Sequence, residues 1–282
     1  MLRFALALAL IFVHGLFAKA DGNQWFEPHG SPMAIALVVH GLNSKPSGMD
    51  SLAQALAEIK IAAYRVSLPG HFGPLNNMKT VTRAQWTESF FEFYSAAKSR
   101  AAKDQVPLYF VGNSLGALIG LSLQLEKNPQ KQIRFDKMVL LAPAITPKFF
   151  TRWVKMFGLF GDDYILKSWS PESYQAQLGT SVAAYKALFA LVDEVEQKAR
   201  PQELDVSTLV FIDPKDELVS FEKLKKFISA HSLKRWKTVP VSNDGSSLKG
   251  KYHHLIIDEK SVGPEQWKKM LKDIEIHLGA ES

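Results

Sequence analysis

Short apolar runs alternate along this chain with longer stretches of helical periodicity. The first run, residues 34–40 (AIALVVH), is rich in β-branched residues, which is typical of a strand buried on both faces of a parallel sheet. The alternation predicts an α/β fold with right-handed βαβ units and a mostly parallel, doubly wound sheet. Such sheets bind ligands at the carboxyl ends of their strands. The predicted strands are 34–40, 62–68, 106–111, 138–142, 208–212 and 236–241, and the predicted helices are 49–59, 82–102, 115–127 and 264–277.

Residues 147–204 interrupt this alternation, because they offer aromatic and helical stretches but no convincing strand. We interpret them as a helical insertion between the fourth and fifth strands of a core formed by residues 21–146 and 205–282. Phe150, Trp153 and Phe157 follow helical spacing and form one apolar stripe. This stripe either packs onto the core or lines an apolar binding pocket, and residues 182–195 predict a second amphipathic helix.

The N-terminus resembles a secretory signal. Arg3 precedes an apolar run over residues 4–13, and Ala18-Lys19-Ala20 offers small residues at the spacing used by signal peptidase. We therefore expect residues 1–20 to be cleaved near Ala20 and the chain to be exported, either to a periplasm or out of the cell. A retained membrane anchor or a buried helix is the alternative, but the apolar run is short for a membrane span.

Composition narrows the function classes. The 282 residues are 46% hydrophobic, enough for one large core, and an exported chain without cysteine must obtain its stability from packing. The formal net charge is +6, but the lysines are scattered and form no basic stripe interleaved with aromatics. We therefore expect no nucleic acid partner. Peripheral contact with an anionic lipid surface is compatible with this charge, although a solvated basic surface is the favoured explanation.

A candidate nucleophile lies in Gly112-Asn113-Ser114-Leu115-Gly116, directly between a predicted strand and a predicted helix. A sharp turn of this kind holds the serine in a strained conformation, and the flanking glycines avoid collisions. The Leu115 amide would lie at a helix N-terminus, where it could stabilise an oxyanion. The alternative interpretation is an ordinary glycine-rich turn in which the serine caps a helix.

His40-Gly41-Leu42 ends the first predicted strand at the same sheet edge. The glycine allows a close approach of the backbone, so the Leu42 amide is the candidate for the second oxyanion donor. We expect His40 to be structural, because in this chain order the catalytic base comes last.

Candidates for the acid and the base follow the last two predicted strands. Asp216 is favoured as the acid over Asp213, which we expect to cap the turn at the following proline, and Glu217 is the weaker alternative. The base comes from the doublet His253-His254, and either histidine could serve by position. The order Ser, Asp, His is that of α/β-hydrolases.

Several segments resemble the α/β-hydrolase superfamily, in particular its monoacylglycerol lipase, lysophospholipase and carboxylesterase branch. The matching segments are VVHGLNS, LPGHFG, GNSLG, DPKDELVS and YHHLIIDE. The resemblance implies that the insertion is a helical cap over the nucleophile, that His71 is structural, and, from the spacing after the histidine, that His253 is the base. Two features depart from the pattern: Asp213 replaces a glycine, and residues 21–33 hold little strand signal.

We therefore expect a serine carboxylester hydrolase that acts on small apolar esters, such as monoacylglycerols or lysophospholipids, without metal or organic cofactor. Phe150, Trp153 and Phe157 would then form the acyl-binding wall. A peptidase or thioesterase on the same fold is the enzymatic alternative. The non-enzymatic alternative is a catalytically silent homologue that binds a hydrophobic ligand.

Overall fold

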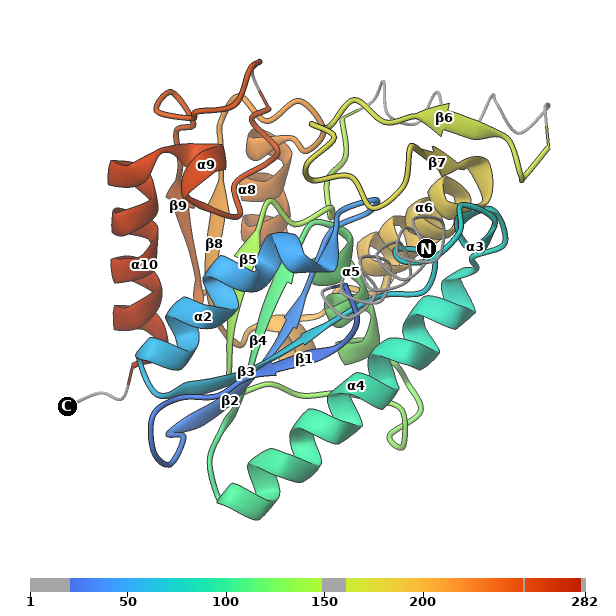
Figure 1. The fold of residues 1–282 in the computed structure, drawn as a ribbon. Coiled ribbons are helices and arrows are strands. Elements are labelled where there is room, and N and C mark those ends of the chain that lie inside the picture. Colours follow the sequence, from blue (N-terminus) through green and yellow to red (C-terminus); the bar gives the residue numbers. More distant parts are fainter. Residues whose placement is uncertain (1–20, 149–160, 251, 280–282) are drawn as a thin grey trace, which may run out of the picture.

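The structure is a computed structural model that describes residues 21–148, 161–250 and 252–279 (Figure 1). The predicted signal segment, residues 1–20, lies outside these described residues. The predicted acyl-binding residues Phe150, Trp153 and Phe157 also lie outside them. No helix within the described residues combines the length and the apolar character that a membrane crossing requires.

A seven-stranded sheet forms the centre of the molecule, in the order β1-β3-β2-β4-β5-β8-β9 (Figure 1). All neighbouring strands are parallel except β1, which pairs antiparallel with β3. The strands are β1 (Gln24–Phe26), β2 (Ala34–Val39), β3 (Ile61–Val66), β4 (Leu108–Asn113), β5 (Lys137–Leu141), β8 (Ser207–Ile212) and β9 (Trp236–Pro240). The predicted mostly parallel α/β sheet is thereby confirmed, because each of the six predicted strands is present.

Helices cover both faces of the sheet (Figure 1). Alternate residues of β2 point to opposite sides: Ile35 and Leu37 pack with α4, α5 and α6, whereas Ala36 and Val38 pack with α2 and α10. The apolar run that predicts a strand buried on both faces therefore fills two separate cores. The helices are η1 (Pro46–Met49), α2 (Asp50–Glu58), α3 (Asn76–Lys79), α4 (Arg83–Asp104), α5 (Leu115–Gln124), α6 (Val182–Lys198), α7 (Pro201–Leu204), α8 (Phe221–Ala230), α9 (Glu259–Val262) and α10 (Pro264–Leu278).

The interval between β5 and β8 contains more regular structure than the sequence predicts. The helix predicted over 182–195 is present as α6. The expectation that this interval contains no strand is wrong, because β6 (Ile165–Lys167) and β7 (Gly179–Ser181) pair antiparallel. Each strand has three residues, too few for an alternating pattern to be visible. The apolar face of α6 packs in the same core as α4 and α5, so this helix also closes one face of the main sheet.

Two further elements give weak sequence signals. The strand β1 has only three residues and lies in a segment where we expect little strand structure, but Trp25 within it stacks on Tyr64 of β3 at 4.5 Å between ring centroids. The helix α8 is absent from the predicted elements, although Ser220 caps its N-terminus and Leu224 and Phe227 are buried at helical spacing.

Candidate active site

The turn between β4 and α5 carries Ser114 in an unusual conformation. Its φ of 46° and ψ of −108° lie in a region that residues with side chains rarely adopt. A Cβ at Gly116 would lie 2.6 Å from the carbonyl oxygen of Val39, and one at Gly112 would lie 2.7 Å from Cα of Ala117. Side chains cannot fit at these two positions. The turn therefore needs both glycines, and strain of this kind concentrates at functional sites.

An unbroken hydrogen-bond relay leads away from the Ser114 hydroxyl. His254 Nε2 lies 2.9 Å from Ser114 Oγ, and His254 Nδ1 lies 2.8 Å from Asp216 Oδ2. The ionised carboxylate can only accept, so His254 Nδ1 donates to it and Nε2 is left to accept from the serine hydroxyl. The other oxygen, Asp216 Oδ1, accepts from the amides of Leu218 and Val219 at 2.7 and 2.8 Å. Three residues far apart in sequence thus meet at the carboxyl edge of the sheet.

Charge within the relay shifts the pKa values of both partners. Burial disfavours the imidazolium of His254, but the charge and hydrogen bond of Asp216, together with the charge of Glu217, outweigh burial and raise its pKa. Burial also disfavours the ionised Asp216, but its pKa is lowered by the charge and hydrogen bond of His254 and by the two backbone amides. The carboxylate therefore stays ionised and can stabilise an imidazolium.

The structure corrects the sequence-based choice between the adjacent histidines. His254 contacts Ser114, whereas His253 Nδ1 lies 2.7 Å from Asp213 Oδ2. The spacing that favours His253 is one residue, then an apolar pair, with an acid shortly beyond. That acid is Asp258, but the Asp258 carboxylate accepts from the Ser261 amide in the first turn of α9 and from the Tyr174 hydroxyl. It therefore orients neither imidazole. The two histidines lie in a turn that is closed by the hydrogen bond from the Leu255 amide to the Tyr252 carbonyl, and their side chains point to different carboxylates. Sequence spacing alone does not give the directions of these two side chains.

The backbone after β2 lies against the turn that carries Ser114. A Cβ at Gly41 would lie 3.1 Å from Cβ of Ser114, so the glycine permits this close approach. The amides of Leu42 and Leu115 donate to no acceptor within the described residues. Leu115 is the first residue of α5, where unsatisfied amides and the helix dipole favour an anion. The sequence-based choice of these two amides as oxyanion donors stays a prediction.

Two buried histidines hold the loop that contains Leu42. His40 Nε2 accepts from the Leu68 amide at 3.1 Å, and His71 Nε2 accepts from the Asn43 amide at 3.0 Å. Burial lowers the pKa of His40 well below its ordinary value and that of His71 to about 4. Both imidazoles are therefore neutral near pH 7. Their side chains contact backbone and not Ser114, consistent with the structural roles that the sequence predicts for them.

A segment from the interval between β5 and β8 covers the same loop. The side chain of Asn43 pairs with the backbone of Gln177 in both directions, at 2.8 and 3.1 Å, and the Asn43 carbonyl accepts from the Ala176 amide at 3.0 Å. Gln177 also donates from its side chain to the Gly73 carbonyl at 2.9 Å. Hydrogen bonds thus hold residues 175–177 against the loop that contains Leu42.

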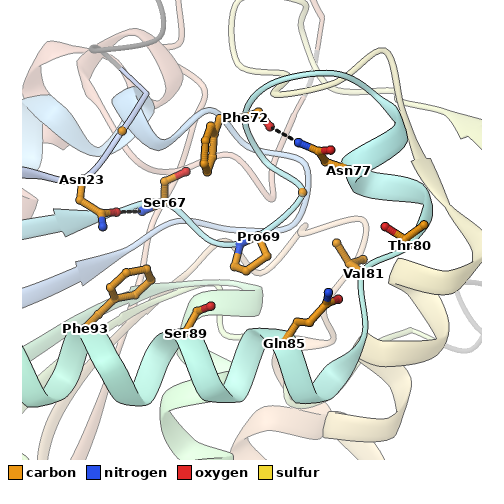
Figure 2. A pocket seen from close by; sticks show the side chains of 12 residues that line it. Asn23, Ser67, Pro69, Phe72, Asn77, Thr80, Val81, Gln85, Ser89 and Phe93 are labelled. Atoms are coloured by element: carbon orange, nitrogen blue, oxygen red, sulfur yellow. Dashed lines mark hydrogen bonds between the residues drawn. The ribbon is translucent and has the colours of Figure 1, made fainter.

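A separate cavity of about 450 Å³ lies between the segment after β3 and the helix α4 (Figure 2). Figure 2 shows Pro69, Phe72 and Gln85 around it. Its lining is uncharged and contains no member of the relay; it consists of Gly22, Asn23, Ser67, Pro69, Gly70, Phe72, Asn77, Thr80, Val81, Gln85, Ser89 and Phe93. No three His, Asp or Glu side chains in the described part of the chain converge as metal ligands do.

Comparisons with known proteins agree with this architecture. The sequence model of the family described as serine aminopeptidase, S33, matches residues 30–178, just over half of the chain. Rat monoglyceride lipase (Rattus norvegicus) is 26% identical over 133 residues, which are 45% of this chain and 42% of that enzyme. The match thus spans less than half the length of this relative.

Solved structures share the fold. A soluble variant of monoglyceride lipase from Saccharomyces cerevisiae superposes with a TM-score of 0.71 at 12% identity, covering 90% of this chain and 91% of that one. Monoacylglycerol lipase from Paleococcus ferrophilus superposes with a TM-score of 0.63 at 17% identity, covering 90% and 98%. At these identities the likeness concerns the fold alone.

Proposed function

Because the chain belongs to the serine aminopeptidase S33 family, we propose that it is a serine hydrolase of carboxylic esters, in the lipase and esterase-like branch of the α/β-hydrolases. Ser114 is the nucleophile, His254 the general base and Asp216 the residue that orients the base. The hydrogen-bond relay from Ser114 Oγ through His254 to Asp216 carries the proposal. Such a relay supplies an activated hydroxyl at neutral pH.

In the first half of the reaction, Ser114 Oγ attacks the ester carbonyl while its proton passes to His254 Nε2. The resulting imidazolium is stabilised by Asp216, whose carboxylate stays ionised. The tetrahedral intermediate carries its negative charge on the former carbonyl oxygen, which the amides of Leu42 and Leu115 receive. When the carbon–oxygen bond to the alcohol breaks, His254 returns the proton to the leaving oxygen and an acyl-enzyme remains.

In the second half, water takes the place of the alcohol. His254 removes a proton from the water, the hydroxide oxygen attacks the acyl carbonyl, and collapse of the second intermediate releases the carboxylic acid with the proton returned to Ser114 Oγ. The proposed mechanism uses no metal or organic cofactor.

Esters of apolar acids with a small polar alcohol are the proposed substrates, monoacylglycerols first. The rat monoglyceride lipase relative and the two monoacylglycerol lipase structures support this class. Phe150, Trp153 and Phe157 remain the predicted acyl-binding wall. Peripheral contact with a lipid surface would bring such substrates to the enzyme, and the basic net charge of +6 is compatible with it.

A fluorophosphonate probe and a series of p-nitrophenyl and monoacylglycerol esters test the proposal. Wild-type protein is expected to incorporate one probe at Ser114 and to hydrolyse the esters, and Ser114→Ala to do neither. Ser122→Ala, which removes a hydroxyl hydrogen-bonded to Glu194 away from the relay, is the matched control and should be labelled like wild type. Labelling that persists in Ser114→Ala would refute the assignment, and an unlabelled wild type would favour a silent ligand-binding homologue.

Peptide hydrolysis is the second candidate, because the family is described as serine aminopeptidase. The same relay would form an acyl-enzyme from an amide or a thioester. Aminoacyl p-nitroanilides and acyl thioesters, assayed beside the esters, separate these cases. A higher kcat/KM for the anilides than for every ester would replace the ester proposal by a peptidase.

Export is proposed from the sequence of residues 1–20 alone. Cleavage after Ala20 would leave Asp21 as the first residue, whose side chain accepts from the Ser47 hydroxyl at 2.7 Å. Intact mass and N-terminal sequencing of protein secreted by an expression host are expected to give a chain that begins at Asp21. Full-length protein that retains Met1 would contradict cleavage.

A further inference from the structure

A second histidine–carboxylate pair lies beside the relay, and the mechanism does not use it. His253 Nδ1 is 2.7 Å from Asp213 Oδ2, and the side chains of His253 and Asp213 are only 13% and 3% exposed. Adjacent histidines thus each have their own carboxylate, 213 for 253 and 216 for 254.

Both carboxylates come from one turn after β8. The Asp216 amide donates to the Asp213 carbonyl at 2.9 Å, and Asp213 Oδ1 accepts from the Lys215 amide at 2.7 Å. The Glu217 side chain accepts from the His254 amide at 3.1 Å. Three side chains of this turn therefore bind the segment that carries the two histidines. One oxygen of Asp213 is held by the backbone of its own turn, and the other contacts His253.

A doublet of histidines creates a problem of register. Neighbouring Cα atoms are about 3.8 Å apart, so a slip by one residue would bring the other imidazole to Asp216 and Ser114. The two rings have the same donors and acceptors, and Asp216 does not discriminate between them chemically. A buried carboxylate left without a partner is costly, so a second carboxylate that holds His253 opposes the slip.

We propose that Asp213 and His253 form a positioning pair that fixes the register of this loop, so that His254 and not His253 faces the nucleophile. The inference rests on the proposed function, since it concerns the base of that reaction. His253 itself transfers no proton in the reaction. Its role is to occupy the neighbouring carboxylate and so leave one productive arrangement of the doublet.

Substitutions at the pair separate register control from simple attachment of the loop. Asp213→Asn removes the charge that holds His253, and kcat is expected to fall about 10-fold with KM changed little, because a small displacement of a catalytic group is costly. His253→Asn keeps an N–H donor for Asp213 and removes the competing imidazole, so kcat should stay within about threefold of wild type.

The double variant Asp213→Asn/His253→Asn is the decisive one. Without a second imidazole there is nothing to compete for Asp216, so kcat is expected to recover from the level of Asp213→Asn to within about threefold of wild type. A pair that only attached the loop would leave the double variant as slow as Asp213→Asn. Low-field proton NMR adds a second readout: wild type should show two carboxylate-bound imidazole N–H signals and His253→Asn one.

Lys215→Ala is the matched control, because this exposed residue lies on the same turn between the two carboxylates and contacts neither imidazole. It should match wild type, and thermal unfolding of every variant confirms that the fold is retained. An Asp213→Asn kcat within twofold of wild type, or a double variant as slow as Asp213→Asn, would overturn the inference. A wild type without Ser114 labelling would instead refute the proposed function.

Discussion

Two pairs of histidines lie at the carboxyl edge of the sheet, in different surroundings. His40 and His71 are buried, 4.6 Å apart between ring centroids, and their ring nitrogens meet backbone groups. His253 and His254 each meet a carboxylate. The first pair supports the backbone that carries Leu42, whereas His254 of the second pair contacts the Ser114 hydroxyl.

The difference shows that the partner of an imidazole decides what it can do. Burial without a carboxylate lowers the pKa of His71 to about 4 and leaves a neutral acceptor for a backbone amide. At His254 burial is instead outweighed by the charges of Asp216 and Glu217 and the hydrogen bond to Asp216, so the pKa of this ring is raised and its imidazolium is stabilised. Of these four histidines, His254 thus combines a raised pKa with a contact to the Ser114 hydroxyl.

The largest expected effect comes from removing the negative charge of Asp216, the partner of His254. Asp216→Asn keeps the shape of the side chain, but its amide donates to His254 Nδ1 and favours the tautomer that is protonated at Nε2. His254 Nε2 then cannot accept the serine proton, and the imidazolium loses its counter-charge. We expect kcat for p-nitrophenyl esters to fall by about 10⁴-fold. Asp205→Asn is the control: Asp205 lies between α7 and β8, where it accepts from the Arg235 amide, and its kcat should stay near that of wild type. A loss below tenfold in Asp216→Asn would show that the carboxylate is dispensable.

A smaller effect is expected when the neutral pair is changed. His71 takes up protons only below about pH 4 in the folded state, whereas the unfolded chain takes them up near the ordinary value of 6.5. The unfolded state therefore binds more protons between these values, and the free energy of unfolding must fall as pH drops through this window. The contribution is on the order of 3 kcal/mol at about 1.4 kcal/mol per pKa unit.

His71→Gln keeps an acceptor for the Asn43 amide but cannot titrate. Urea unfolding between pH 7.5 and 4 should show a shallower loss of stability for this variant than for wild type, with a remainder from His40. His231→Gln, at the C-terminal end of α8, controls for the loss of any one histidine. Equal pH dependence of wild type and His71→Gln would contradict a neutral, buried His71.

The smallest expected effect comes from removing the charge of Glu217, which lies next to His254. Glu217 contributes to the raised pKa of His254, and its side chain accepts from the His254 amide. Glu217→Gln keeps the acceptor and removes the charge, so the acidic limb of kcat/KM should move to lower pH, since the base must be neutral to act. A limb that stays in place or moves to higher pH would contradict this assignment.

Much of the architecture could be predicted because its signals are local and periodic. The run 34–39 and the glycines around Ser114 give β2 and the nucleophile turn directly, and Asp216 follows from its place after β8. The strands β6 and β7 could not be predicted, since three residues carry no period. The choice between His253 and His254 depends on the direction of two adjacent side chains, which Asp213 and Asp216 determine in three dimensions.

The most direct test compares the rate at which a fluorophosphonate labels Ser114 in His254→Ala and in His253→Ala, with peptide mapping to locate the adduct. The relay predicts that His254→Ala slows labelling by about 10³-fold or more and that His253→Ala stays within about tenfold of wild type. The reverse order, with His253→Ala the slower variant, would contradict the account.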